Sequence, residues 1–465
     1  MIIIWSFFMN MKCIACGHEI KKLMTLENMP SGAQDIPDAE EVKDDRPVTL
    51  ELCQCPECGL VQFDCEPVSY YKDVIRAGGG TRTMTRLRHE EYARLLQYMQ
   101  EYGIKGRNIV EVGCGRGEFL RMWQNLSESE EGAEALRKDR EKDPLSGQQK
   151  AMPLRLMGIE HKKELVEEAK RLQEEASGRL RKGSGGDAPE GGSTENLCEK
   201  SPCHQDSAEI SYRVAEGFAE GDYMYPDGPY DAFVQFNFLE HQPYPKRMLQ
   251  NIRKNLKQKA IGLVTVPSFE YILKYNGYYE LLRDHIANYT EFTLQKLFQD
   301  NGFEVLDMRT VNRDTIEIIV KKADPDELTS LRYNGSLIDV SALKESYERM
   351  NKEVNAHIGH LAETGKTMAI WGASHQGFTL ASTTGLGGKV RYIIDSAKFK
   401  QGRFSPASHI PIVSPEHFFD EKVDEILIVA PGYTDEIASI IGEKYGKEVK
   451  ILVLKTDKIE EYVAD

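Results

Sequence analysis

The sequence predicts an α/β protein in three parts: a small cysteine-bearing module, then two domains in which strands and helices alternate. Three observations lead to this fold class. The chain has 465 residues, enough for about three domains. Two matched Cys-x-x-Cys-Gly segments lie near the N-terminus. Beyond residue 85, strand-like apolar runs alternate with helical patterns, which is typical of doubly wound sheets.

Composition excludes several classes of function. The formal net charge of −15 repels phosphate backbones, and no run of Lys and Arg offsets it, so we expect no nucleic-acid partner. No apolar run approaches the ~20 residues that cross a bilayer, so we expect no membrane partner. The opening MIIIWSFFMNMK lacks the features of a signal peptide, which favours a start at Met9 or Met11 over Met1 and a cytoplasmic protein.

The first part, residues 11–68, is predicted to be a zinc-binding module. Its ligands would be the four cysteines of the two knuckles, Cys13, Cys16, Cys55 and Cys58. Two residues between cysteines let both thiolates face one ion, and four thiolates suit tetrahedral zinc. Cys53 and Cys65 are the alternatives if the register differs. Because protein atoms would fill every position, we expect the zinc to be structural.

The second part, residues 69–322, is predicted to be an α/β domain that begins with a helix over 85–100. Its expected strands are 108–112, 156–160, 230–236, 260–266 and 315–320, and its later helices are 162–174, 245–256 and 291–301. We expect disordered insertions at about 127–150, which is rich in charged residues, and at 175–209, which is rich in glycine. Neither stretch has enough apolar surface to offset the entropy lost on ordering. Cys198 and Cys203 lie in the second and are expected to be idle.

The third part, residues 326–465, is predicted to be another α/β domain. A long helix over 341–364 precedes expected strands at 367–371, 390–394, 425–429 and 449–453. The first of these strands ends on the turn Gly372-Ala-Ser-His-Gln-Gly377.

A glycine-rich turn follows the strand 108–112 and indicates a ligand site. Gly113, Gly115 and Gly117 would let the backbone approach a ligand closely, and Glu111 precedes them. The spacing Gly-x-Gly-x-Gly departs from the dinucleotide fingerprint, and a plain strand-to-helix turn would also explain it. Glu160 ends the next strand, where a carboxylate can bind ribose hydroxyls.

Two further segments carry candidate catalytic groups. Asn237, Glu240 and His241 follow the apolar strand 230–236, where the carboxyl ends of strands meet a ligand. Asp284 and His285 are adjacent, and a carboxylate can orient an imidazole for proton transfer. A histidine near a loop is more often structural, and that reading stays open for both histidines.

The run Glu111–Leu120 resembles motif I of class I S-adenosylmethionine-dependent methyltransferases, and 238–243 resembles the segment after their fourth strand. The flanks are similar to nucleotide-sugar C-methyltransferases. That similarity rests on the zinc module, on Tyr70-Tyr71-Lys-Asp, on the turn 372–377, and on Asp395, 400–403, 409–412 and 425–437. The resemblance implies a Rossmann-like methyltransferase domain and a second Rossmann-like C-terminal domain that binds substrate.

The resemblance also implies roles for individual residues. S-adenosylmethionine would be held by Glu111, Gly113, Gly115, Gly117, Glu160, Phe218 (near the adenine) and Asn237. His285 would act as a base that Asp284 orients, with His241 as a second donor beside Glu240. A small-molecule substrate, most simply a nucleotide-sugar, would meet Tyr71, Tyr289 and, near its diphosphate, Lys400 and Arg403, although both cations could also be ordinary solvated charges.

The sequence departs from the family at three positions. Leu282 and Arg283 stand where the family has tyrosine and histidine, and the tyrosine expected near Ile75 is absent. We therefore carry three readings: C-methylation of a nucleotide-linked ketosugar, O- or N-methylation of another small molecule, and a non-catalytic scaffold of the same architecture.

Overall fold

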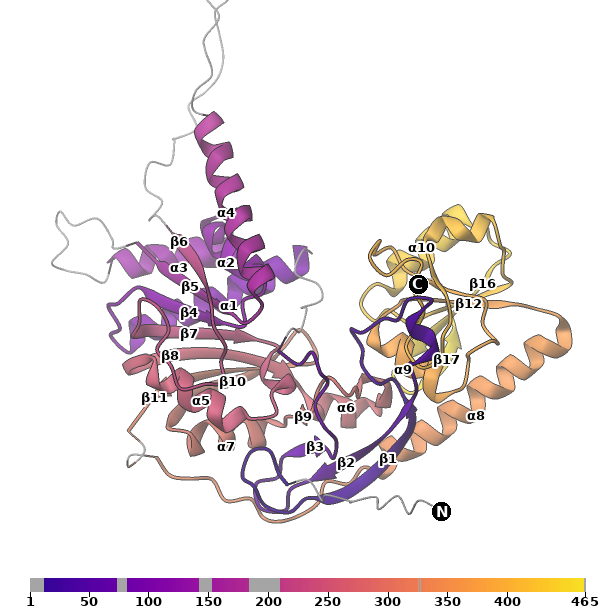
Figure 1. Ribbon diagram of the computed structural model, residues 1–465, viewed down its shortest axis with the longest axis horizontal. Coiled ribbons are helices and arrows are strands. Elements are labelled where there is room, and N and C mark those ends of the chain that lie inside the picture. Colours follow the sequence, from indigo (N-terminus) through magenta and orange to yellow (C-terminus); the bar gives the residue numbers. More distant parts are fainter. Residues whose placement is uncertain are drawn as a thin grey trace, which may run out of the picture.

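The computed structural model describes residues 12–72, 82–141, 153–183, 210–324, 326 and 328–463. The alternative start residues, Cys198 and Cys203 lie outside these ranges. The chain forms three sheets (Figure 1): the largest stands on one side, the C-terminal sheet on the other, and the N-terminal strands run between them. The α/β class is confirmed, while the exact domain bounds stay predictions. None of the helices in these ranges is long and apolar enough to cross a membrane.

The largest sheet has seven strands in the order β10-β11-β8-β7-β4-β5-β6. They are β4 (Asn108–Val112), β5 (Arg155–Glu160), β6 (Ser211–Glu216), β7 (Tyr230–Phe236), β8 (Leu256–Pro267), β10 (Phe303–Val311) and β11 (Thr315–Lys322). The strands β4 to β8 run parallel to one another, and β11 and β10 add an antiparallel edge beside β8. Every residue of β7 is buried, as expected of a central parallel strand that is covered on both faces.

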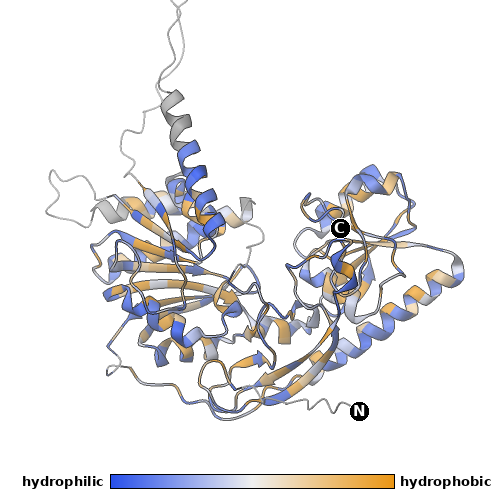
Figure 2. Cartoon of the chain, viewed as in Figure 1, coloured by the Kyte–Doolittle hydropathy of each residue, from blue (hydrophilic) through white to orange (hydrophobic). Residues whose placement is uncertain are grey.

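Helices cover both faces of this sheet. They are α1 (Arg82–Glu101), α2 (Glu118–Gln124), α3 (Glu130–Glu141), α4 (Lys163–Gly183), α5 (Pro245–Lys254) and α7 (Glu291–Asp300). Trp123 of α2 stacks on Tyr92 of α1 with 4.0 Å between ring centroids, which fastens the first helix beside the glycine turn. Figure 2 shows apolar residues concentrated on the strands and hydrophilic residues on the outer helices.

The N-terminal sheet contains a strand from far along the chain. Its order is β1 (Lys21–Met29), β2 (Val48–Gln54), β3 (Val61–Phe63) and β9 (Ala287–Asn288), all antiparallel. The helix α6 (Phe269–Tyr275) and the single turn Tyr278–Glu280 lie on the way from the large sheet to β9.

The C-terminal sheet has the order β14-β13-β12-β15-β16-β17 and is parallel except for β17. Its elements are α8 (Ser341–Thr364), β12 (Met368–Trp371), α9 (His375–Thr383), β13 (Ile393–Ile394), β14 (Ile412–Val413), β15 (Glu425–Ile428), α10 (Thr434–Lys444), β16 (Lys450–Lys455) and β17 (Lys458–Glu461). The predicted helix over 341–364 is confirmed to the residue.

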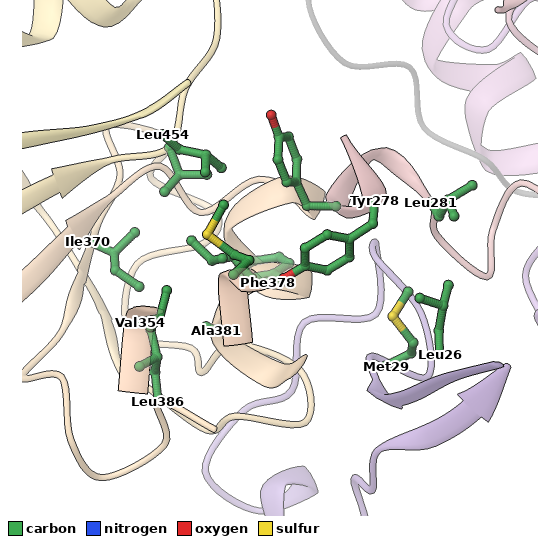
Figure 3. Packing of buried hydrophobic residues seen from close by; sticks show 14 of the residues in the cluster. Leu26, Met29, Tyr278, Leu281, Val354, Ile370, Phe378, Ala381, Leu386 and Leu454 are labelled. Atoms are coloured by element: carbon green, nitrogen blue, oxygen red, sulfur yellow. The ribbon is translucent and has the colours of Figure 1, made fainter. Parts of the chain in front are cut away.

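One hydrophobic core joins the N-terminal sheet to the C-terminal domain. It contains Leu26 and Met29 of β1, Tyr278 and Leu281 of the large domain, and Phe378 of α9. Figure 3 shows these side chains gathered between the N-terminal strand and the C-terminal elements. Burying so many apolar groups across the junction is the largest favourable contribution to holding the three parts in place.

The prediction of disorder over 127–150 was wrong for its first half, and the helix α4 extends into 175–209 up to Gly183. The helix α3 forms because its residues Ala135 and Leu136 pack against the core that contains the fully buried Leu126, which precedes the helix. Few apolar residues suffice when they share one helical face. The remainder of both stretches, 142–152 and 184–209, lies outside the described residues. The strands β6 and β10 were not predicted.

Gly262→Ala tests the packing of β8 on β7. A Cβ at Gly262 would collide with the ring of Phe233, so we expect the variant to lose roughly 1–3 kcal/mol of stability. Calorimetric melting measures this loss. The matched control is Gly359→Ala in α8, where a Cβ meets nothing within 4 Å and a gain of about 0.5–1 kcal/mol is expected. Equal melting temperatures for the two variants would contradict the packing.

Candidate functional site

The predicted ligand residues gather where the parallel strands of the large sheet end. Gly113 follows β4, Glu160 ends β5, Phe218 follows β6 and Asn237 follows β7. The carboxyl ends of neighbouring parallel strands meet at one edge of the sheet, which is where α/β proteins bind ligands. Residues that are distant in sequence are thereby brought to one place, as predicted.

The glycine turn has the backbone that only glycine adopts easily. The φ angles of Gly113, Gly115 and Gly117 are 75°, 57° and 74°, all in the left-handed region. The Gly113 amide donates to the Ile159 carbonyl at 2.9 Å, which ties the turn to β5. A Cβ at Gly113 would lie 3.1 Å from the Phe238 ring, so a side chain there would crowd the turn.

Glu160 points at this turn. One carboxylate oxygen accepts the Gly115 amide at 2.8 Å, and the other accepts the Lys162 amide at 3.0 Å. The side chain is nearly buried, as is that of Glu111 on the neighbouring strand. A carboxylate oxygen has more than one lone pair, so Glu160 can accept further hydrogen bonds from the hydroxyls of a ribose.

Aromatic rings collect around Phe218. Tyr71, His161 and Phe238 each meet it edge to face, with centroids 6.3, 5.3 and 6.4 Å away. The ammonium of Lys72 lies 4.9 Å from the Phe218 centroid. Burial, with the neighbouring Glu220 charge, raises the pKa of Tyr71 to about 12, so its hydroxyl stays protonated. An aromatic platform beside the Glu160 carboxylate suits a flat heterocycle.

Asn237 turns the chain sharply after β7. Its φ is 45°, its amide donates to the Thr265 carbonyl at 3.0 Å, and the Thr265 hydroxyl donates to its side-chain oxygen at 3.2 Å. Asparagine tolerates the left-handed conformation better than most residues. The turn brings the following single helical turn, Leu239–His241, to the edge of the sheet.

Two histidines lie together just beyond this turn. The rings of His241 and His285 are 4.7 Å apart and meet edge to face. Ligand atoms of Glu240, His241 and His285 all lie within 4.8 Å of one another. His241 Nδ1 is 2.7 Å from the Asp284 carbonyl oxygen, which can only accept, so this nitrogen carries the proton.

Burial keeps both imidazoles neutral. It lowers the pKa of His241, and burial together with His241 and His375 holds the pKa of His285 well below 6.5. Neutral His241 therefore has a lone pair on Nε2, which lies 3.9 Å from a carboxylate oxygen of Glu240. This corrects the expected role of His241 as a donor: in its neutral form Nε2 can only accept a proton.

Asp284 does not orient His285, contrary to the prediction. Its carboxylate accepts the Ala33 amide at 2.8 Å and the Tyr70 hydroxyl at 2.7 Å. Its contribution to the histidine pair is the backbone carbonyl that receives His241. Tyr70 itself was missed as a site residue, because nothing in its sequence surroundings distinguishes it from Tyr71.

The four predicted cysteines form one cluster. Their sulfur atoms lie within 4.8 Å of one another, with Cys13 to Cys58 and Cys16 to Cys55 both at 3.5 Å. The amides of the following glycines, Gly17 and Gly59, fold back onto the carbonyls of Cys13 and Cys55 at 2.8 Å. The alternatives Cys53 and Cys65 are not in this group. Four converging sulfurs on two equivalent knuckles match the donor set of a tetrahedral zinc site.

Tyr289 is a core residue. It is 1 % exposed, and burial and the nearby Glu240 charge raise its pKa well above 10. It borders the same cavity as Cys16 and Cys58, and both Glu240 and the cysteine cluster lie close enough to raise its pKa. Because its side chain is buried, the structure does not favour the predicted contact of Tyr289 with substrate.

The two predicted cations of the C-terminal domain are engaged elsewhere. The Lys400 ammonium donates to the Ala373 carbonyl at 2.7 Å and pairs with Asp395 at 3.2 Å. Arg403 donates to the Ile36 carbonyl of the N-terminal module at 2.7 Å. Lys400 thus stabilises the turn after β12, and Arg403 joins two parts of the chain, while the contact of both cations with a diphosphate stays a prediction.

A different contact from the C-terminal domain reaches the site. His375 and Gln376, at the start of α9, both contact the carboxylate of Glu280, at 3.2 Å and 3.1 Å. The sequence analysis identified the turn 372–377, but it did not predict that these side chains contact Glu280. Glu280 lies on the segment that leads to Asp284 and His285, and His375 is near enough to His285 to help lower its pKa.

Comparison with known families agrees with this geometry. Residues 84–308 match a methyltransferase domain, and residues 337–454 match a C-methyltransferase C-terminal domain. The matches identify a methyltransferase domain and a C-methyltransferase C-terminal domain within this chain. The two matched regions are the large sheet with its helices and most of the C-terminal domain.

Individual relatives are distant. Over 211 residues the chain is 26 % identical to C-methyltransferase NovU of Streptomyces niveus, and the match covers 42 % of this chain and 50 % of that protein. The chain thus spans half the length of this curated relative. Among solved structures, magnesium protoporphyrin IX methyltransferase from Synechocystis is 12 % identical, with a TM-score of 0.32 over 53 % of this chain and 90 % of that one. A methyltransferase from Aquifex aeolicus is 14 % identical, with a TM-score of 0.30 over 50 % of this chain and 92 % of that one.

The depressed pKa of His285 predicts a pH dependence of stability. In the unfolded chain a histidine binds a proton below about pH 6.5, which the folded His285 does not bind, so stability falls as the pH drops below that value. Replacing it by His285→Asn should make the decline between about pH 6.5 and pH 5 shallower, by up to about 1.4 kcal/mol per pH unit. Melting temperatures measured against pH test this. His360→Asn, on an exposed face of α8, is the control, and an equal effect of both variants would contradict it.

Proposed function

We propose that this protein transfers a methyl group from S-adenosylmethionine to a carbon atom of a nucleotide-linked ketosugar. The observation that carries the proposal is the neutral pair of buried His241 and half-buried His285 beside Glu240, at the carboxyl end of β7. A neutral imidazole is a proton acceptor near pH 7. The match to a C-methyltransferase C-terminal domain supports transfer to carbon.

The chemistry requires a base because a carbon next to a ketone is a poor nucleophile until it loses a proton. In the proposed mechanism His285 accepts that α proton, and the electrons of the C–H bond form an enolate. The carboxylate of Glu240 has an oxygen within 4.8 Å of a ring nitrogen of His285 and can stabilise the protonated imidazole. When bound, the cofactor supplies an electrophilic methyl group, and the enolate carbon displaces S-adenosylhomocysteine from it. The proton on His285 then returns to water.

The residues proposed to hold the cofactor lie at four strand ends. Glu160 would bind the ribose hydroxyls, and the glycine turn with Glu111 would contact the methionine part. Phe218 would lie against the adenine, because the surrounding rings form an apolar platform. Asn237 would border the methyl group, since it directly precedes the histidine segment.

Zinc is proposed for the cluster of Cys13, Cys16, Cys55 and Cys58. All four donors are thiolates and come from the chain itself, so the ion would leave no coordination position for water. It would stabilise the module rather than polarise a substrate.

The substrate is proposed to enter between the glycine turn and the turn 372–377. Tyr71 lies at the Phe218 platform and can offer its hydroxyl to a sugar. Lys400 would reach a diphosphate only by giving up Asp395 or the Ala373 carbonyl, so its role depends on substrate-induced rearrangement. Arg403 and Tyr289 are weaker candidates because their present contacts hold the fold together.

Exchange of the α proton tests the proposed chemistry. With S-adenosylhomocysteine present, the protein should exchange that proton of a nucleoside-diphosphate-linked ketosugar with deuterated water, as followed by NMR. The variant His285→Ala should lose at least about 100-fold of the rate, as expected for removing a general base. His360→Ala is the control. Methyl transfer by the native protein without any exchange would favour O- or N-methylation instead.

Binding of S-adenosylhomocysteine tests the cofactor site. Glu160→Ala removes a buried acceptor for the ribose hydroxyls and should weaken binding about tenfold to hundredfold, as for other hydrogen bonds to charged groups. Calorimetric titration measures the affinity, and Glu164→Ala on the exposed first turn of α4 should leave it unchanged. If the folded native protein binds no S-adenosylhomocysteine, the result would favour the interpretation as a non-catalytic scaffold.

A further inference from the structure

The segment that directly follows His285 forms a strand of the N-terminal sheet. The β9 residues Ala287 and Asn288 pair with Gln62 and Val61 of β3, and the Phe63 amide donates to the Ile286 carbonyl at 3.0 Å. The backbone of residues 286–288 is therefore hydrogen-bonded to the N-terminal module, while the next residue, Tyr289, bridges to Ser268 at the end of β8.

The two residues before His285 are held by the same module. Arg283 donates to the carbonyls of Ser31 and Glu66, both at 3.1 Å. Asp284 accepts the Ala33 amide and the Tyr70 hydroxyl at 2.8 Å and 2.7 Å. Burial and the Asp284 charge raise the pKa of Tyr70, so its phenol stays protonated and remains a donor.

These contacts continue to the second histidine. The Asp284 carbonyl accepts the proton on His241 Nδ1 at 2.7 Å, which leaves the lone pair on Nε2. Any shift of Asp284 therefore alters both the tautomer of His241 and its position against His285, 4.7 Å away. One residue of the loop thus couples the module to both imidazoles.

The cysteine cluster lies at the other end of these contacts. The knuckle Cys55–Cys58 runs directly into β3, which begins at Val61. Gln62 of β3 is fully buried and accepts the Ile14 amide of the other knuckle at 2.9 Å. The strand that pairs with β9 is consequently anchored to both knuckles.

We propose that the N-terminal module positions His241 and His285, through the β3–β9 pairing and through the hydrogen bonds that Ala33 and Tyr70 donate to Asp284. The effect of this positioning on catalysis rests on the proposed function, in which His285 is the base. Tyr70 is then a positioning residue, which acts through Asp284 and not on the substrate. The module, together with the ion it would hold, becomes part of the methyl-transfer site.

Tyr70→Phe tests the proposal because it removes one hydroxyl and keeps the ring. We expect unchanged zinc content, melting temperature within a few degrees and S-adenosylhomocysteine affinity within about twofold. The Nδ1 proton of His241, followed by ¹⁵N-edited NMR, should exchange with water at least about tenfold faster. The α-proton exchange rate should fall about tenfold, with no change in the KM for the ketosugar, as for loss of a hydrogen bond to a charged group.

Tyr347→Phe is the matched control. Its hydroxyl also binds the N-terminal module, at the Glu27 amide and carbonyl, both at 3.3 Å, but through α8 and far along the chain from Asp284. We expect this variant to leave the His241 signal and the exchange rate unchanged.

A second measurement does not depend on Tyr70. Removing the metal with a chelator should shift the ring signals of His241 and His285 while S-adenosylhomocysteine still binds, because the cofactor residues lie on the large sheet. Histidine signals and exchange rates that are unchanged in both Tyr70→Phe and the metal-free protein would overturn the positioning role. If the signals respond as expected but the native protein exchanges no α proton, the proposed function fails and the positioning role stands.

Discussion

The pairing of β3 with β9 is the contact on which the arrangement of the site depends. Buried backbone groups must be hydrogen-bonded, and the residues after His285 meet this requirement on the N-terminal module. The loop between α6 and α7 thereby reaches the smaller sheet through β9, while Tyr289 directly after β9 bridges to Ser268 at the end of β8. The histidine segment consequently lies where the two layers meet, and neither part of the chain could place it alone.

The C-terminal domain is attached to this same junction. Its core is continuous with that of the N-terminal sheet and with Tyr278 and Leu281 of the large domain. Polar contacts add to this attachment: Asp45 of the module binds His409, and Glu280 binds His375 and Gln376. Positions that resembled a substrate-binding signature in the sequence therefore contribute, in part, to holding the three parts together.

Desolvation sets the protonation of the site. Burial is the main reason that the imidazoles of His241 and His285 stay neutral, and the bond from Nδ1 to a backbone carbonyl decides which nitrogen of His241 holds the lone pair. A backbone carbonyl cannot titrate, so this choice of tautomer does not change with pH. The Asp284 carboxylate, which could have supplied a charge to His285, is instead used to fasten the loop.

The sequence by itself determined the features whose chemistry is local. Both knuckles, the glycine turn and Glu160 follow from short spacings and from the strand that precedes each, because backbone geometry over a few residues is decided by those residues. The two α/β domains and the helix over 341–364 followed from hydrophobic periodicity in the same way, whereas their Rossmann-like character was implied by the family resemblance. The disorder assigned to 127–150 failed because a few apolar side chains found a core that composition does not reveal.

Only the tertiary structure decided how these pieces act on one another. A two-residue strand such as β9 carries almost no periodic signal, so its pairing with β3 could not be read from the sequence. The partner of a polar side chain is equally unspecified: Asp284 could have oriented its neighbour, yet it binds Tyr70, and Arg403 binds a carbonyl instead of a ligand. Hydrogen bonds between distant segments depend on how whole layers pack, and that packing is settled by the buried core as a whole.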